Sequence, residues 1–363
     1  MTRLLVYTVI TRSRLFQARV LMESVARNIP EAERHVLVID PADGAFDSTA
    51  EPFTVTFGHQ LNLPHFSSYA FVNDVLGFCC FLKPVFGQFL LERTKADLIV
   101  YADSDVCCYA PPDALVELLQ KSPVALTPHS TEPAGPGAYR SDGDLMRSGP
   151  FNAGLFACRR CAETDLFLSW WQRAMESERC LDAAIAHDQP WLSLAAVYFP
   201  WIAVLRDPGY NVAYWNIQRR LLARLSDGTL TAGGRPLVFF HFSFFDHNRP
   251  TWLAHRPPIV IPAEGPELPG LLDDHAKRLE AAGSAACLAW RYAYHFFTDG
   301  KAITSAHRQY FLDRAWDEAG PNGNPFDPNF TTENCRGVKA VYAVDQSIPR
   351  LARVVNRQWR RLR

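Results

Sequence analysis

Two aspartates one residue apart, Asp103 and Asp105, directly follow an apolar run at residues 98–101. A short apolar run between polar residues is typical of a fully buried strand. A strand ending in two carboxylates needs a positive group opposite them, and a turn just beyond the strand would let both reach one hard cation. Mg²⁺ and Mn²⁺ favour oxygen ligands, and nucleotide sites combine carboxylates with the phosphates of the substrate. The pair therefore predicts a metal site for a phosphate-bearing ligand, and two solvated loop acids are the alternative.

Strand and helix patterns alternate around this pair, which predicts βαβ units in an α/β fold with a mostly parallel sheet. Ligands of such sheets bind outside the carboxyl ends of the strands, where Asp103 and Asp105 would lie. A helix is predicted over 81–93 with Pro84 in its first turn, and 131–148 reads as a lid-like loop or insertion. The predicted strands are 3–11, 34–40, 53–57, 98–105, 123–128, 151–158 and 235–243. The other predicted helices are 15–28, 111–120, 165–177 and 188–198, with further helices in the segments 266–283 and 288–318.

Composition narrows the class of protein. The 363 residues are 48% hydrophobic with a net charge of −1, so the charge gives no reason to expect nucleic-acid binding. The apolar runs are shorter than the ~18 residues that span a bilayer, and the first residues alternate like a strand rather than a signal peptide. Nine cysteines, several of them adjacent, are expected to be reduced, which favours the cytoplasm.

Five short motifs follow one another along the chain: Lys83-Pro84, Asp103-Ser104-Asp105, Asn152-Ala153-Gly154, Asp188-Gln189 and His241-Phe242-Ser243. In this order they resemble nucleotide-sugar glycosyltransferases of the GT-A fold, especially bacterial proteins similar to family 8, over residues 3–252. The resemblance implies retaining transfer of a sugar, with a UDP-sugar as the preferred donor, to a hydroxyl acceptor in glycan or cell-surface polysaccharide assembly. The predicted domains are a GT-A domain over 1–264 and a helical C-terminal extension over 265–363.

The resemblance also implies roles for individual residues. Asp103, Asp105 and His241 would hold Mn²⁺ or Mg²⁺ beside the diphosphate of the donor. The residues implied to act near the transferred sugar are Lys83, Asn152 and Asp188. Tyr214, Trp215 and Asn216 would line the sugar pocket. Thr8, Thr11 and Asp40 would lie near the nucleotide base, Ser104 would touch the ribose, and Arg249 would bind phosphate.

Structural roles are the alternatives to these assignments. His241 could be a core histidine, Lys83 a surface residue, Asp188 a helix N-cap, and Trp215 part of the core. The family pattern also has a glycine three residues after the histidine and then Lys-Pro-Trp. This chain has Phe244, which would crowd a backbone cradle for phosphate, and Arg249-Pro-Thr-Trp.

Other functions stay open at this stage. In a phosphatase of the haloacid-dehalogenase type, Asp103 would be the nucleophile and Asp105 the acid, although Cys107 replaces the usual Thr or Val. A non-catalytic sugar-binding protein on the same scaffold is another possibility.

Residues 349–363 combine six arginines with an apolar stripe, which is the pattern of an interfacial helix. This pattern predicts peripheral contact with the inner face of the membrane. A membrane adaptor, or an enzyme with a lipid-linked acceptor, would act there. A glycan or protein hydroxyl is the other acceptor considered, and an inverting enzyme would need a base such as Asp142 or Asp144.

Overall fold

The computed structural model describes residues 2–177, 187–255, 258–260, 267–316 and 323–328. Within them the chain forms two compact units. The first contains residues 1–62 and 75–292, and the second contains 63–74 and the chain from 293 onward. The predicted boundary at 264/265 therefore falls inside the first unit, and the basic tail at 349–363 lies outside the described residues.

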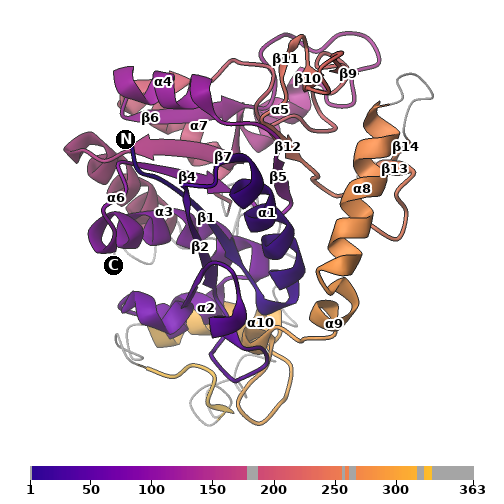
Figure 1. The fold of residues 1–363 in the computed structure, drawn as a ribbon. Helices are drawn as coiled ribbons and strands as arrows, with labels where there is room; N and C mark the ends of the chain where they lie inside the picture. Colours follow the sequence, from indigo (N-terminus) through magenta and orange to yellow (C-terminus); the bar gives the residue numbers. More distant parts are fainter. Residues whose placement is uncertain (1, 178–186, 256–257, 261–266, 317–322, 329–363) are drawn as a thin grey trace. The chain divides into compact units, whose positions relative to one another are not determined.

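The first unit is built on a seven-stranded sheet in the order β3-β2-β1-β4-β7-β6-β8 (Figure 1). Every pairing is parallel except those of β7, which runs antiparallel to both β4 and β6. This is the predicted α/β fold with a mostly parallel, mixed sheet. The strands are β1 (Leu4–Ile10), β2 (Glu33–Val38), β3 (Thr54–Phe57), β4 (Leu98–Ala102), β6 (Val124–Pro128), β7 (Phe151–Arg159) and β8 (Ile202–Val204).

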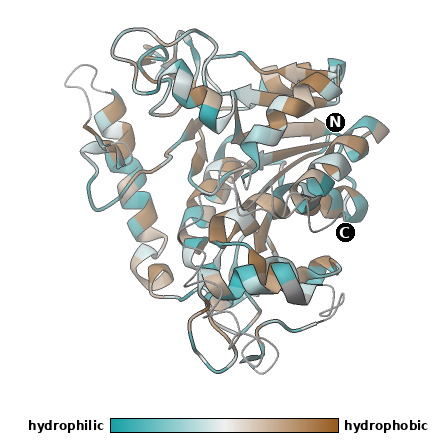
Figure 2. Cartoon of the chain, turned by 180° about the vertical axis from the view of Figure 1, so that it is seen from behind, coloured by the Kyte–Doolittle hydropathy of each residue, from teal (hydrophilic) through white to brown (hydrophobic). Residues whose placement is uncertain are grey.

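Alternate residues of β1 face opposite layers of helices, as the period of a strand requires. Val6 joins the apolar core that contains α1 and α8, whereas Tyr7 packs edge-on against Phe86 of α3 at 5.7 Å between ring centres. Figure 2 shows the strands largely in hydrophobic colours, consistent with burial on both faces. The helices of this unit are α1 (Leu15–Asn28), α3 (Val75–Arg93), α4 (Asp113–Lys121), α5 (Asp142–Ser148), α6 (Ala162–Ser177), α7 (Gln189–Tyr198), α8 (Glu267–Ala281) and α9 (Ser284–Leu288).

The helix α3 corrects the prediction for residues 81–93. It begins at Val75, so Pro84 lies in its interior rather than in its first turn. An interior proline removes one hydrogen bond and crowds the preceding turn, which is why the pattern placed the helix start there. Burial of Phe78 and Phe86 on both sides of the proline offsets that cost. By length and composition alone α3 could cross a membrane, but 67% of its apolar window is buried, as in a core helix.

Smaller sheets complete the first unit. β5 (Val106–Cys108) pairs antiparallel with β12 (Phe239–His241). The remaining strands are β9 (Leu222–Arg224), β10 (Leu230–Ala232), β11 (Arg235–Pro236), β13 (Trp252–His255) and β14 (Pro258–Val260). The segment predicted as a loop over 131–148 ends in α5, whose Ser141 and Asp144 form a capping box. The seven cysteines among the described residues are free thiols.

The second unit is held together by aromatic side chains. Phe71 packs against Phe311 and Phe326, at 5.1 and 5.3 Å between ring centres, and Arg308 donates a 2.6 Å hydrogen bond to the carbonyl of Asn73. The segment 288–318, which was predicted to be helical, contains several short helical elements. They are η4 (Ala293–His295), α10 (Ser305–Tyr310) and a π-helical turn (Phe311–Ala315), and α2 (Phe66–Val72) joins them from the first part of the chain.

Candidate metal and donor site

The direction of β7 brings two of the sequence motifs together. Asp103 follows the carboxyl end of β4, and Asn152 and Gly154 stand at the start of β7. Because these strands are antiparallel, Ala102 pairs with Leu155, and the amide of Asp103 donates to the carbonyl of Gly154 at 2.8 Å. The end of one strand and the start of its neighbour therefore form one polar cluster at the sheet edge where α/β folds bind ligands.

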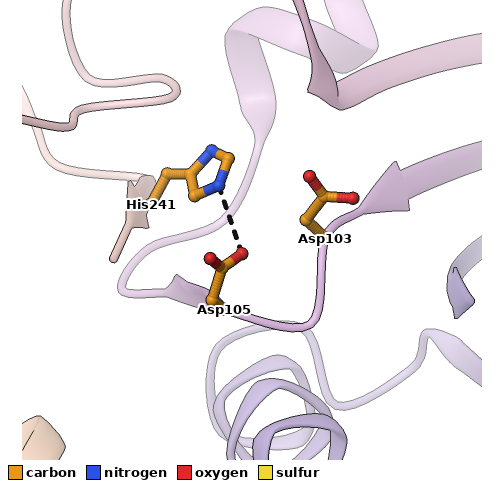
Figure 3. A group of neighbouring side chains, drawn as sticks. All are labelled: Asp103, Asp105 and His241. Carbon is orange, nitrogen blue, oxygen red and sulfur yellow. Dashed lines mark ion pairs between the residues drawn. The ribbon is translucent and has the colours of Figure 1, made fainter. Parts of the chain in front are cut away.

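Asp103, Asp105 and His241 lie close enough to share one ion. Their ligand atoms all lie within 4.8 Å of one another, and His241 Nε2 is 3.1 Å from Asp105 Oδ1 (Figure 3). The pairing of β5 with β12 fixes this arrangement because it sets His241 opposite Val106, the residue after Asp105. Two carboxylates and an imidazole form a donor set that fits Mn²⁺, or Mg²⁺ through the carboxylates.

The orientation of His241 depends on Asn211. Its Nδ1 lies 3.0 Å from the side-chain oxygen of Asn211, whose amide nitrogen in turn donates to Thr127 and Asn152, each at 3.0 Å. A proton on Nδ1 leaves the lone pair of Nε2 facing the carboxylates, as a metal-binding histidine requires. Burial alone would lower the pKa of His241, but the Asp105 carboxylate raises it above its ordinary value.

Lys83 is a buried cation rather than a surface residue. Its side chain projects from α3, and its Nζ lies 3.1 Å from Asp103 Oδ1 and 2.6 Å from Asp188 Oδ2, with a 3.1 Å hydrogen bond to the carbonyl of Ala153. Burial would lower the pKa of Lys83, but the two carboxylates raise it well above the ordinary value, so the ammonium stays charged. Tyr101 donates a 2.5 Å hydrogen bond to the same oxygen of Asp103.

Asp188 occupies the N-cap position of α7, but its side chain makes no capping hydrogen bond. It contacts Lys83 instead. The side chain of Asn152 is held in place by two hydrogen bonds. Its amide nitrogen donates to Gln189 Oε1 at 2.8 Å, and its oxygen accepts from the amide of Gly154 at 3.1 Å. The structure therefore brings Lys83, Asn152 and Asp188 beside Asp103.

Gly154 is required by close packing. A Cβ added there would lie 2.7 Å from Asn152 Oδ1, 2.8 Å from Asp103 Oδ2 and closer still to Cε1 of His241. All three of these groups belong to the cluster, so a side chain at residue 154 would displace them.

The residues expected to bind the nucleotide lie within β1 (Thr8) and in the segments that follow β1 (Thr11), β2 (Asp40) and β4 (Ser104). Thr8 is buried, and its hydroxyl has no hydrogen-bond partner among the described residues. Thr11 Oγ1 lies 2.9 Å from Ser13 Oγ, and Asp40 accepts a 2.8 Å hydrogen bond from the backbone of Arg12. Ser104 donates to Gln17 at 3.1 Å.

Tyr214, Trp215 and Asn216 are all buried. The ring of Trp215 meets that of His241 edge-on at 5.2 Å, and the amide of Asn216 is used in hydrogen bonds to the backbone of His129, Asn211 and Ala213. Arg249, in the segment after β12, lies over the ring of Trp252, at 5.9 Å from its centre.

Phe244 adopts a left-handed backbone with φ 57°. This is the conformation that a glycine would favour. Its side chain is 53% exposed.

Three contributors were not predicted as site residues. Asn211 belongs to none of the five motifs, and no spacing rule connects it to His241. Tyr101 reads as an ordinary apolar strand residue, and its hydroxyl contact requires the turn at 103–105 to be known. Gln189 belongs to the Asp188-Gln189 motif, but the motif assigns it no role. Its position at the start of a predicted helix, next to Asp188, is the signal in the sequence that points to it.

In a phosphatase of the haloacid-dehalogenase type, Asp273, Asp274 and Lys277 could imitate the acidic pair and the lysine of that family. Asp273 and Lys277 form an i,i+4 ion pair of 2.7 Å with largely exposed side chains on α8. A helix, rather than a strand end, carries them.

His129 makes a testable contribution to the pH dependence of stability. Burial, together with nearby Arg140, lowers the pKa of His129 to about 3, whereas an unfolded histidine titrates near 6.5. The contribution of neutral His129 to the free energy of unfolding is therefore full above pH 6.5. It is lost as the pH falls toward 3, by about 1.4 kcal/mol per pH unit. We expect His129→Gln to flatten the rise in unfolding free energy between pH 4 and 6.5, measured by urea titration. His59→Gln, on an exposed histidine, should leave the slope unchanged, and an equal effect of both variants would contradict the assignment.

No protein-family model and no curated protein matches the sequence. Solved structures do match. The glycosyltransferase GlyE of Streptococcus pneumoniae TIGR4 is 14% identical with a TM-score of 0.44, over 82% of this chain and 66% of that one. The galactosyltransferase LgtC, solved with donor and acceptor sugar analogues, is 16% identical with a TM-score of 0.43, over 77% and 95%. Mouse xyloside xylosyltransferase 1 is 12% identical with a TM-score of 0.39, over 66% and 97%.

All three TM-scores lie below 0.5. The solved structures that this chain matches are glycosyltransferases, the class that the five motifs predict, at 12–16% sequence identity. This chain spans about two thirds of the length of GlyE. At these identities the likeness concerns the fold, so the functional conclusion depends on the side chains of the site itself.

Proposed function

We propose that this chain is a metal-dependent glycosyltransferase that moves a sugar from a nucleotide-diphosphate donor to a hydroxyl acceptor. The observation that carries the proposal is the grouping of Asp103, Asp105 and His241, with ligand atoms within 4.8 Å of one another, beside the buried pair of Lys83 and Asp188. Both groups stand at the sheet edge where α/β folds bind nucleotides.

The donor set supports a hard divalent ion, held by Asp103, Asp105 and His241. When bound, Mn²⁺ or Mg²⁺ would neutralise charge on a departing diphosphate. The buried Thr8 hydroxyl, which has no partner among the described residues, would meet the nucleoside from the end of β1. A uridine base and retention of anomeric configuration are part of this proposal.

Lys83, Asn152 and Asp188 would position the transferred sugar. Lys83 holds Asp188 and Asp103 at fixed distances, so a carboxylate oxygen of Asp188 can accept a hydrogen bond from a sugar hydroxyl. Asn152 adds an amide fixed by Gln189 and Gly154. Such a constellation binds and orients hydroxyl groups, which is the main demand of glycosyl transfer on the protein.

A thermal-shift panel tests the proposal. UDP, GDP, CDP and dTDP would each be tested with Mn²⁺, Mg²⁺ or a chelator. A ligand that binds only the folded state raises stability by about 2.7 kcal/mol at a hundredfold excess over Kd, and we expect one nucleotide to do so only with metal. Asp105→Asn should abolish this shift, while Asp273→Asn, on an exposed acid of α8, should preserve it. A folded protein that responds to no nucleotide would overturn the proposal.

A further inference from the structure

A hollow of about 250 Å³ opens between the segment 130–145 and the turn at 215–219. It does not include the metal-binding candidates, but Trp215 connects the two places, because its ring meets His241 edge-on and also lines the hollow. A ligand in the hollow would therefore lie next to the ring that packs against His241.

The walls of the hollow are fixed by specific hydrogen bonds. Gln218 accepts from the amide of Tyr139 and donates to the carbonyl of Gly137, each at 3.0 Å. Asp142 accepts from the amide of Ala134 at 3.0 Å. The segment before α5, which looked like an open loop in the sequence, is thus tied both to the turn after Trp215 and to its own helix.

The charged residues that line the hollow are Arg140 and Arg219, and no acidic residue lines it. Arg140 donates to the Ser148 hydroxyl at 2.9 Å and to the carbonyl of Asp144 at 3.2 Å, and no carboxylate of the described residues forms an ion pair with it. Arg219 lies 3.8 Å from Glu132, with both side chains more than half exposed. Such a pair is weak in water, so both guanidinium groups can take an anion.

Trp215 supplies the apolar wall. Its side chain is 8% exposed, and its indole nitrogen has no hydrogen-bond partner among the described residues. An aromatic face with a polar tip suits a sugar ring, and the volume, slightly below the roughly 300–1,000 Å³ of drug-sized sites, suits one sugar unit.

We propose that this hollow is the acceptor site and that the acceptor is an anionic saccharide. The carboxylate or phosphate of the acceptor would bind Arg140 and Arg219, with its sugar ring against Trp215. The inference rests on the proposed glycosyltransferase function, and it specifies the chemical class of acceptor that this function would use.

Binding of three small probes, without nucleotide or metal, tests the inference. The probes are methyl β-glucuronide, glucose 1-phosphate and the neutral methyl β-glucoside, with dissociation constants from calorimetry at low and high salt. A guanidinium–anion contact is worth about tenfold or more in affinity. We expect at least one anionic probe to bind about tenfold more tightly than the glucoside, with the preference reduced at high salt. The two anionic probes distinguish a carboxylate from a phosphate.

The double variant Arg140→Gln/Arg219→Gln should reduce the preference to twofold or less. Arg147→Gln is the matched control, since Arg147 lies on α5, seven residues after Arg140, is 77% exposed and pairs with Asp144 without lining the hollow. Arg219→Gln alone, on a side chain 56% exposed, gives a second reading if the double variant fails to fold.

Equal binding of all three probes would overturn the inference, as would a preference that survives in the variants or is lost in the control. If anionic probes bind the hollow but no nucleotide shifts the melting temperature, the proposed function fails and the anion site stands. If a nucleotide raises the melting temperature but the anionic probes bind no more tightly than the glucoside, the proposed function stands and the anionic acceptor is excluded.

Discussion

Replacing Lys83 by methionine is expected to lower the free energy of unfolding by about 3–5 kcal/mol. Methionine fits the helix and the space, but it leaves the Asp188 carboxylate buried, with 4% of its side chain exposed and its counter-ion removed. Asp103 loses the same partner. An uncompensated buried charge costs more than the ion pair contributes, which makes this one of the largest effects expected in the protein. Urea titration at pH 7 would measure it.

Two further variants separate charge from packing. Lys121→Met removes an exposed lysine, 71% exposed, from α4, and should change stability by less than about 0.5 kcal/mol. In the double variant Lys83→Met/Asp188→Asn the second change removes the orphaned charge, so we expect it to recover part of the loss. A Lys83→Met variant as stable as the parent would show that the two carboxylates do not depend on this cation.

Gly154→Ala is expected to lower stability by about 1–3 kcal/mol and to abolish the metal-dependent response to nucleotides. The new methyl group would overlap Asn152 Oδ1, Asp103 Oδ2 and Cε1 of His241. These are side-chain atoms of the candidate site, so relief of the overlap moves the groups proposed to hold the metal and the sugar. Urea titration gives the first effect, and the melting temperature with Mn²⁺ and nucleotide gives the second.

Gly270→Ala is the matched control, because nothing lies within 4 Å of a Cβ at that position in α8. It should be neutral or slightly stabilising, since alanine favours a helix over glycine. A Gly154→Ala variant with unchanged nucleotide response would mean that the cluster tolerates a displaced Asp103 and His241, and would argue against a metal held by those residues.

Much of the fold was predictable because the hydrophobic periods are local. The helix at 15–28 was predicted with the bounds that the structure has, and strands appeared where apolar residues ended in polar ones, as in β1 and β4. The predicted start of α3 was wrong because an interior proline is locally unfavourable. The helix continues through Pro84 because its side chains are buried, and that burial depends on residues distant in the sequence.

The site was predictable at the level of motifs and not of contacts. Asp103 and Asp105 could be placed at a strand end from their own neighbours. The nearness of Asp103 to Lys83 depends on how α3 packs against the sheet, and its nearness to Gly154 depends on the antiparallel direction of β7. Neither is a local property. The role of Asn211 behind His241 likewise arises only when the strand β12 is placed against β5.

Tyr101 gives the site a rigid support. Its ring lies in a continuous aromatic layer with Tyr7 and Phe156, at 5.2 and 5.1 Å between ring centres, and Phe156 continues it to Trp171 of α6. The hydroxyl of the same residue holds Asp103. Moving that carboxylate would require the layer behind it to repack, and close-packed interiors resist such changes. Little of the binding free energy of a ligand would then be consumed in reorganising the protein, so its affinity and its rate of reaction would benefit together.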